Sequence, residues 1–230
     1  MTSTWIARAG PLNAIVDADV AVRAGWTPVD LAAAYLAGGA RFLQIRAKSL
    51  SGAAFLELTS RICAIAHPAG AVVVVNDRVD IARIGGADGV HVGQDDLAPA
   101  AARTLLGPAA IVGLSTHSER QIEAALAQPL TYLAVGPVFG TATKATGYSA
   151  VALDLVRHAA ERVRFELAVR RGERQAIGLV AIGGITLDRA ASVIEAGATA
   201  VAVITDLIAD GDPEGRVRAY LARLDRTGRV

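Results

Sequence analysis

Eight short apolar runs recur along the 230 residues, and most of the segments between them carry the spacing of amphipathic helices. Short runs rich in valine, isoleucine and leucine are typical of fully buried parallel strands. After the second run, Phe55, Leu58 and Ile62 fall on one face of a helix that would pack on a sheet. The predicted strands are residues 12–16, 42–45, 72–75, 89–92, 111–114, 132–135, 179–182 and 200–204.

Eight strand and helix units predict an α/β fold, the (β/α)8 TIM barrel, as a single domain over residues 1–230. A barrel of this kind takes roughly 250 residues. An open doubly wound sheet is the alternative, but it normally has a glycine-rich nucleotide-binding turn after its first strand, and none follows Val16. An Arg- and Glu-rich stretch near residues 161–175 is predicted to be a solvated insertion.

The composition restricts the classes of protein that the chain can represent. Hydrophobic residues make up 53% of the chain and aromatic residues only 4%, so the core must be aliphatic. The net charge of +1 gives no electrostatic reason to expect a nucleic acid or an anionic membrane as a partner. No apolar run approaches the ~18 residues that span a bilayer, and the N-terminus lacks the apolar region of a signal peptide. We therefore expect a cytoplasmic enzyme acting on small molecules, with a homo-oligomer left open.

Acidic side chains follow two consecutive predicted strands. Asn76 and Asp77 come after the third strand, and Asp95 and Asp96 come shortly after the fourth. Ligands of parallel α/β sheets bind at the carboxyl ends of the strands, so these acids should face one site. Neighbouring residues in an extended segment point in opposite directions, so we expect only Asp96 of the second pair to reach a metal.

Lysine is rare in this chain. Of 23 basic residues, 21 are arginines, and the two lysines, Lys48 and Lys144, both follow predicted strands. An ammonium group is a compact charge that suits a phosphate oxygen, and the planar guanidinium group does not replace it geometrically. Thr141 and Thr143 lie in the same segment as Lys144, and their hydroxyl and backbone N–H groups complete a predicted phosphate cradle.

Two further groups of residues extend the predicted site. Gln44, Arg46 and Lys48 alternate at the end of the second strand, which places them on one side, toward the barrel interior. A glycine pair ending in Gly184 follows the seventh strand, and Thr205 follows the eighth. Loops after strands 7 and 8 form the recurring phosphate site of these barrels.

The distribution of charge separates two subsites. Arg46, Lys48 and Lys144 together with Asp77 and Asp96 suit a diphosphate held through Mg²⁺, which prefers one or two carboxylates plus substrate phosphates. The subsite near Gly184 and Thr205 has only neutral donors, which suits a monophosphate. The chain has no candidate Ser-His-Asp arrangement, no HExxH motif and no cysteine cluster. We therefore predict two phosphorylated substrates and metal-assisted loss of diphosphate.

Two histidines near these segments need separate interpretations. His91 lies between two valines in the fourth predicted strand, and we interpret it as a hydrogen-bonded structural histidine. His117 ends the segment that follows the fifth strand, and its role is open. Cys63 is the single cysteine, which excludes an intrachain disulfide and is explained by burial in a helix.

Six segments together resemble the thiamine phosphate synthase family: QIRAK at residues 44–48, ND at 76–77, ADGVHVGQDD at 87–96, GLSTH at 113–117, GPVFGTATK at 136–144 and AIGGIT at 181–186. The resemblance implies a barrel that joins 4-amino-5-hydroxymethyl-2-methylpyrimidine diphosphate to 4-methyl-5-(2-hydroxyethyl)thiazole phosphate. The products are thiamine phosphate and diphosphate. The implied mechanism is dissociative, with diphosphate leaving before the thiazole nitrogen attacks.

The resemblance also implies site residues. It assigns the metal to Asp77 and Asp96, and the pyrimidine diphosphate to Gln44, Ile45, Arg46, Ala47, Lys48, Asn76, Ser115 and Lys144. It assigns the thiazole phosphate to Thr141, Thr143, Gly184, Ile204 and Thr205, and it implies direct catalytic roles for Arg46, Lys48, Ser115 and Lys144. The chain departs from the family pattern in having Ala47 where glutamate is common, Gly140 where proline is frequent, and Thr205 where serine is common.

Two other functions remain as alternatives. A TenI-like thiazole tautomerase shares much of this pattern, but it acts on one thiazole phosphate and has no need of the metal acids. Asp77, Asp96 and Lys144 therefore argue against it. A non-catalytic protein that binds thiazole or thiamine phosphate would not need the groups that serve a leaving diphosphate.

Overall fold

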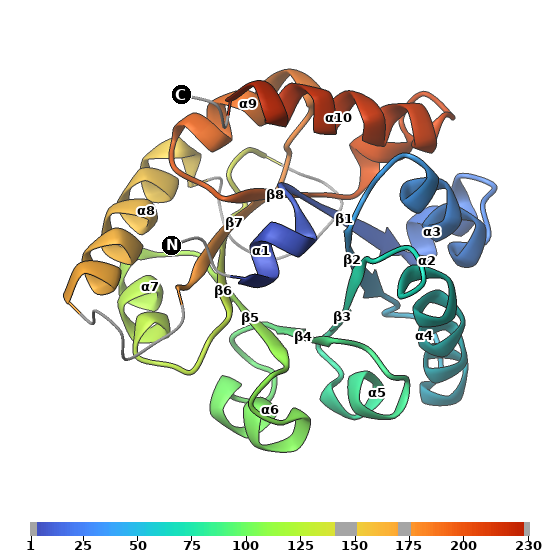
Figure 1. Cartoon of the computed structure of the whole chain (residues 1–230), viewed down its shortest axis with the longest axis horizontal. Helices are drawn as coiled ribbons and strands as arrows, with labels where there is room; N and C mark the ends of the chain where they lie inside the picture. Colours follow the sequence, from blue (N-terminus) through green and yellow to red (C-terminus); the bar gives the residue numbers. More distant parts are fainter. Residues whose placement is uncertain (1–3, 141–150, 170–175, 228–230) are drawn as a thin grey trace.

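The computed structural model describes residues 4–140, 151–169 and 176–227, and its eight strands form one closed parallel barrel in sequence order (Figure 1). The predicted single-domain (β/α)8 barrel is confirmed. Each observed strand differs from its predicted bounds by no more than two residues. The strands are β1 Leu12–Asp17, β2 Phe42–Arg46, β3 Val72–Asn76, β4 Gly89–Val92, β5 Ile111–Thr116, β6 Tyr132–Val135, β7 Gly178–Ile182 and β8 Ala200–Val203.

Helices follow the strands and surround the barrel (Figure 1). The helix predicted around Phe55 is α4, and it buries Cys63 as expected. Helix α8 contains the first part of the predicted insertion, whereas residues 170–175 lie outside the described residues. The helices are α1 Thr4–Ala9, α2 Ala18–Arg23, α3 Pro28–Ala37, α4 Gly52–Ala66, α5 Val79–Ile84, α6 Pro99–Leu106, α7 Glu119–Leu126, α8 Ala152–Val169, α9 Leu187–Glu195, the 3₁₀ helix η1 Thr205–Ile208 and α10 Pro213–Thr227.

The alternation of side chains along each strand produces two apolar layers. Phe42 and Val74 belong to the layer inside the barrel, whereas Leu43 and Val75 pack against the surrounding helices. The register continues around the closed sheet, with Ile15 opposite Gln44 and Gln44 opposite Val74. Polar residues at interior positions near the strand ends therefore face into the barrel mouth.

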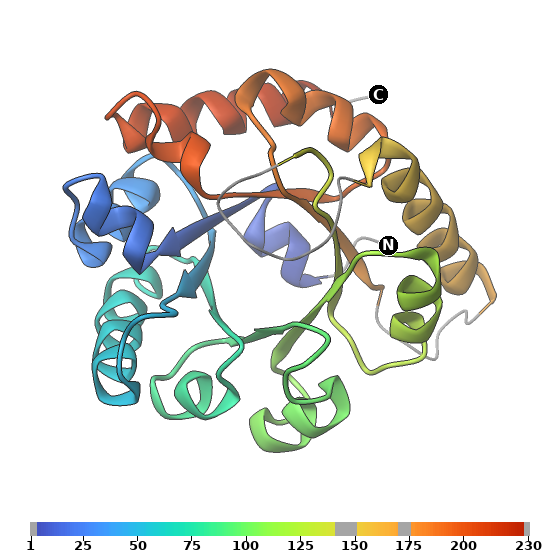
Figure 2. The ribbon, with the colours of Figure 1, turned by 180° about the vertical axis from the view of Figure 1, so that it is seen from behind.

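Helix α1 closes the amino-terminal mouth of the barrel (Figure 1). The Trp5 ring lies edge-on to Phe42, with 5.5 Å between ring centroids, and 5.4 Å from the Tyr132 ring. Figure 2 looks onto the opposite mouth, where the carboxyl ends of the strands and their loops gather. Ligands of (β/α)8 barrels bind at this carboxyl-terminal mouth.

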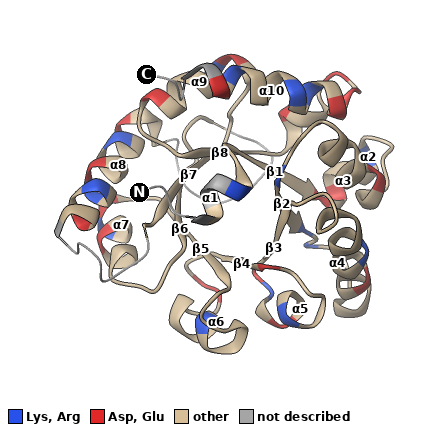
Figure 3. Ribbon diagram, viewed as in Figure 1, with Lys and Arg blue, Asp and Glu red and all other residues tan. Residues whose placement is uncertain are grey.

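Charged residues of both signs are interspersed along the outer helices (Figure 3). Within the described part of the chain, no helix is both long enough and apolar enough to cross a membrane.

Candidate active site

The carboxyl-terminal mouth brings together most of the predicted site residues that the structure describes. Asp17, Arg46 and Asn76 are the last residues of β1, β2 and β3, and Ser115 lies near the end of β5. Gln44, Asn76 and Ser115 are all buried, at interior positions of their strands. Parallel strand ends meet at one edge, which explains why residues far apart in the sequence lie together here.

Two carboxylates, Asp77 after β3 and Asp96 after β4, lie close together at this mouth. Asp77 directly follows β3, and its backbone is in the left-handed region with φ of 64°, which is uncommon for a residue other than glycine. Two backbone hydrogen bonds hold this turn: Asp77 N–H donates to the His91 carbonyl and Arg78 N–H donates to the Asn76 carbonyl, both at 2.8 Å. Burial raises the pKa of Asp77, the Lys48 ammonium lowers this pKa, and the adjacent Asp96 carboxyl raises it.

The predicted geometry of the second acid pair is wrong in one respect. Asp95 and Asp96 lie in a turn after β4 and not in an extended segment, so alternation does not decide which acid faces the metal. The turn is held by Gly93 N–H, which donates to Asp96 Oδ2 at 2.7 Å. It is this geometry that directs Asp96 toward Asp77.

Both cations at the end of β2 already have carboxylate partners. The Arg46 guanidinium binds Asp17, which is 2% exposed, and the Lys48 ammonium binds Asp77. Within residues 4–140, 151–169 and 176–227, the buried Arg46 Nε has no hydrogen-bond partner. Lys48 lies beyond the strand and its side chain is half-exposed, so only Gln44 and Arg46 of the predicted inward group lie inside the barrel. Asp17 was not among the predicted site residues, although it is an acidic residue that directly follows the apolar run of the first strand.

Ile45 and Ala47 have a different orientation from their neighbours. Both side chains belong to the apolar layer between the barrel and its helices. Only their backbone groups can therefore face the mouth, and Ala47 places a small apolar side chain in this outer layer.

Ser115 is held by two contacts inside the barrel. Its hydroxyl lies 2.8 Å from His91 Nε2, and its carbonyl accepts a hydrogen bond from Gln94 Nε2 at 2.6 Å. The other ring nitrogen of His91 lies 2.9 Å from the Tyr132 hydroxyl. The prediction that His91 is hydrogen-bonded is confirmed.

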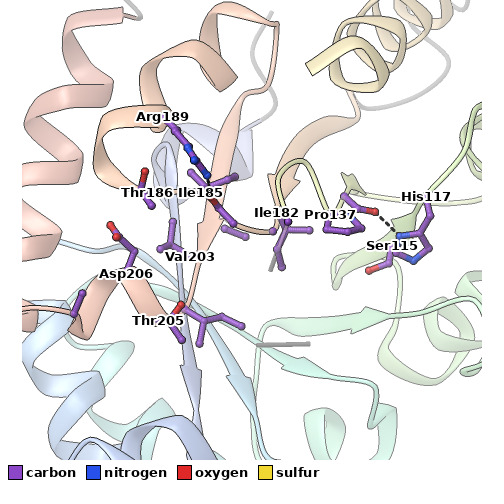
Figure 4. A pocket seen from close by; sticks show the side chains of 17 residues that line it. Ser115, His117, Pro137, Ile182, Ile185, Thr186, Arg189, Val203, Thr205 and Asp206 are labelled. Atoms are coloured by element: carbon purple, nitrogen blue, oxygen red, sulfur yellow. Dashed lines mark hydrogen bonds between the residues drawn. The ribbon is translucent and has the colours of Figure 1, made fainter. Parts of the chain in front are cut away.

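A cavity of about 420 Å³ occupies the side of the mouth between β5 and β8 (Figure 4). Ser115 and His117 line one side, and His117 Nδ1 contacts the Gly136 carbonyl. Gly184, Ile204 and Thr205 line the cavity from the ends of β7 and β8. Ser115 is thus the described residue of the predicted diphosphate part that lines the same cavity as the predicted thiazole phosphate residues.

The predicted thiazole phosphate subsite has a cation that the pattern of strand ends does not predict. Arg189, in the first turn of α9, lines the same cavity as Gly184 and Thr205. Its guanidinium lies 4.9 Å from the centroid of the Phe139 ring and donates to the Gly184 carbonyl at 3.3 Å. The expectation of neutral donors only is therefore wrong, because Arg189 reaches the cavity from a helix and not from a strand end.

Gly184 is constrained by its own backbone and by a neighbouring loop. Its φ is 62°, and a Cβ atom at this position would lie 2.6 Å from the Gly140 carbonyl oxygen. Ile204 ends the predicted eighth strand, but β8 ends at Val203 and Thr205 begins η1. Thr141, Thr143 and Lys144 lie outside the described residues, so their roles stay predictions.

The model of one protein family, described as thiamine monophosphate synthase, matches residues 12–207. The chain belongs to this family. A thiamine-phosphate synthase of Chlorobium luteolum is 37% identical over 201 residues, covering 87% of this chain and 89% of that protein. One from Koribacter versatilis is 41% identical over 212 residues, covering 91% and 93%. The solved thiamine phosphate pyrophosphorylase of Pyrococcus furiosus is 25% identical, with a TM-score of 0.81 over 96% of this chain and 97% of that one.

The acidic residues at the mouth of this thiamine monophosphate synthase family member are possible ligands of a metal ion. Among the described residues, no group of three or more histidine, cysteine, aspartate or glutamate side chains is arranged to hold a metal. Mg²⁺ usually takes one or two carboxylates and completes its coordination with water and substrate phosphates. The close pair of Asp77 and Asp96 fits that pattern.

Proposed function

We propose that the enzyme joins 4-amino-5-hydroxymethyl-2-methylpyrimidine diphosphate to 4-methyl-5-(2-hydroxyethyl)thiazole phosphate at the carboxyl-terminal mouth of the barrel, with Mg²⁺ held by Asp77 and Asp96. Membership of the family makes the chain a transferase of thiamine biosynthesis that acts on small molecules. The observation that carries the proposed site is the cluster of charged groups at the carboxyl-terminal mouth, where Lys48 contacts Asp77, Asp77 lies next to Asp96, and Arg46 contacts Asp17.

The carboxylate pair supports the metal assignment. Burial and the neighbouring Asp96 carboxyl both raise the pKa of Asp77, so a bound cation would stabilise the ionised pair. When bound, Mg²⁺ would supply charge neutralisation at the diphosphate oxygens. Asp77 and Asp96 would hold it from one side and leave its other positions to the substrate.

Arg46 and Lys48 would hold the leaving diphosphate. Asp17 orients the Arg46 guanidinium, and the Nε of Arg46, which has no hydrogen-bond partner among the described residues, supports a role in ligand contact. Lys48 is half-exposed beside Asp77, so its ammonium can reach a phosphate oxygen while it stays close to Asp77. Groups fixed before the reaction stabilise developing charge at little reorganisation cost.

The cavity between β5 and β8 would hold the thiazole phosphate. Thr205 offers a hydroxyl group, Gly184 leaves room for backbone approach, and Arg189 adds a positive charge at the same wall. In the dissociative route, diphosphate departs and the aminopyrimidine delocalises the cation, so the protein need not supply a base. The thiazole nitrogen must then be held close to the pyrimidine methylene, which is a positioning task.

Incubation with both substrates and Mg²⁺ tests the proposal. We expect equal amounts of diphosphate and thiamine phosphate, no diphosphate from the pyrimidine substrate alone beyond slow hydrolysis, and no product with a chelator. A reaction that consumes the thiazole phosphate alone, by isomerisation, would instead identify a tautomerase. Binding without turnover of either substrate would identify a non-catalytic binder.

Asp96→Asn tests the metal site directly, and Asp95→Asn is its matched control, because the two acids are adjacent and exposed in one turn. We expect Asp96→Asn to bind Mg²⁺ more weakly, as measured by calorimetry with diphosphate present, and Asp95→Asn to bind it as the unmodified protein does. Equal Mg²⁺ affinities in all three proteins would refute the assignment. A cytoplasmic location and the oligomeric state stay predictions.

A further inference from the structure

A column of buried rings connects the closed end of the barrel to Ser115. The rings of Trp5 and Tyr132 lie 5.4 Å apart, and the rings of Tyr132 and His91 are stacked with centroids 5.5 Å apart. Hydrogen-bond contacts continue the column from the Tyr132 hydroxyl to His91 and from His91 to the Ser115 hydroxyl. Ser115 is the member of this column that lines the substrate cavity.

The Tyr132 ring occupies space that the neighbouring strand leaves open. Gly113 is opposite Tyr132 in the pairing of β5 with β6, and a Cβ atom at Gly113 would lie 2.1 Å from Tyr132 Cζ. Gly113 also lies two residues before Ser115 on the same strand, so both residues face the barrel interior. The glycine therefore permits the tyrosine ring to reach His91 beneath the cavity.

The direction of the hydrogen bonds follows from the inventory of donors. Burial raises the pKa of Tyr132 far above its usual value, so its phenol stays protonated. Among the described residues, the His91 contact is the one side-chain hydrogen bond of the fully buried Tyr132 hydroxyl. If His91 Nδ1 carried a hydrogen, the phenolic O–H would have no acceptor, and a buried unsatisfied donor is costly. A doubly protonated imidazole would leave the same donor unsatisfied.

We propose that Tyr132 is a positioning residue that fixes His91 as the Nε2–H tautomer and thereby makes the Ser115 hydroxyl a donor to substrate. The phenolic O–H donates to Nδ1, and Nε2–H donates to Ser115 Oγ. The hydrogen of Ser115 then has to point away from His91, toward an acceptor in the cavity. A serine that instead donated to Nε2 would have no hydrogen left for a phosphate oxygen. The catalytic part of this inference rests on the proposed function.

The tautomer can be measured without any activity. Long-range ¹H–¹⁵N correlation spectra of ¹⁵N-histidine-labelled protein distinguish a protonated Nε2 from a protonated Nδ1. The chain has four histidines, and the His91 signals are identified by their loss in His91→Gln. We expect His91 in the free enzyme to carry its hydrogen on Nε2. A spectrum with the hydrogen on Nδ1 would overturn the proposal, whatever reaction the enzyme catalyses.

Kinetics of a double-mutant cycle test the route through Ser115. Tyr132→Phe keeps the ring, and we expect it to lower kcat on the order of tenfold, the scale of one hydrogen bond to a charged group, with smaller changes in KM. In the Ser115→Ala background the same substitution should change kcat less than about twofold, because the group it acts through is gone. An undiminished loss in that background would refute the positioning role.

Tyr35→Phe is the matched control, since it removes another buried phenol, on α3. We expect it to leave kcat and the His91 spectrum unchanged. Should the unmodified protein form no thiamine phosphate, the proposed function fails, and the spectrum still decides the tautomer.

Discussion

Replacing Asp17 by asparagine should destabilise the fold strongly, although the two side chains have nearly the same size and shape. Asp17 is 2% exposed, and its partner Arg46 has a side chain that is 14% exposed. Asp17 also caps α2, where its side chain accepts from Val20 N–H at 3.0 Å. Asparagine caps helices as well as aspartate does, so its carbonyl oxygen can preserve the cap, whereas the charge and the oxygen that accepts from Arg46 are both lost.

The expected loss follows from this burial. Removing one partner of a buried ion pair costs about 3 to 5 kcal/mol, because it leaves the other charge buried and uncompensated. We take the lower end, about 3 kcal/mol, since Arg46 faces an open mouth. For a domain of this size, 1 kcal/mol shifts Tm by about 2 to 4 °C, so Asp17→Asn should lower Tm by about 6 to 12 °C. Thermal and urea unfolding measure both quantities.

Two further variants make the test specific. Asp30→Asn alters an exposed acid in the first turn of α3 and should change the free energy of unfolding by less than about 0.5 kcal/mol. Adding Arg46→Met to Asp17→Asn removes the stranded charge and should recover part of the lost stability. A loss below about 1 kcal/mol for Asp17→Asn, or no recovery in the double variant, would refute the reasoning.

Three other predictions concern activity. Asp96→Asn should lower kcat about 10²-fold or more, as the removal of one contact to developing charge does, and added Mg²⁺ should restore part of the rate. An unchanged Mg²⁺ dependence of diphosphate release would contradict this prediction. Lys144→Ala should lose on the order of 10² in rate and Lys144→Arg should also fall well below the unmodified enzyme, with Tm nearly unchanged; rates within a few-fold would mean that the scarcity of lysine is an accident of composition. Arg189→Met should raise KM for the thiazole phosphate by about tenfold and leave KM for the pyrimidine diphosphate nearly constant. Thr205→Val is a second probe of the same subsite, and equal effects on both substrates would show that the subsites are misassigned.

Hydrophobic periodicity was sufficient to predict the fold. The runs that end at Val75 and Val135 are short, apolar and followed by polar residues, and each is a strand of the closed barrel. The strand ends could not be placed to the residue, because polar residues such as Asn76 and Thr116 continue the sheet through backbone hydrogen bonds that their side chains do not indicate.

The acids and cations at the strand ends were predictable for a related reason. A parallel sheet collects its carboxyl ends, so Asp77 and Lys48 had to approach each other once both followed strands. The turn that directs Asp96 depends on the hydrogen bond from Gly93, which local spacing does not reveal. Arg189 was missed because a helix brings it to the cavity from outside the strand pattern.

Cross-strand contacts were the part of the site that periodicity could not supply. Alternation along a strand predicts which face of the sheet His91 and Tyr132 occupy. It does not predict that their side chains are in contact, because contact depends on the register of β4, β5 and β6. In the observed register His91 is opposite Gly113, and the missing side chain at Gly113 lets the Tyr132 ring pass to His91. Tyr132 looks like a structural core residue in the sequence. In the proposed arrangement it determines whether the Ser115 hydroxyl donates its hydrogen to His91 or to a substrate. The chemistry of Ser115 is thus controlled from beneath the cavity, by groups that no substrate touches.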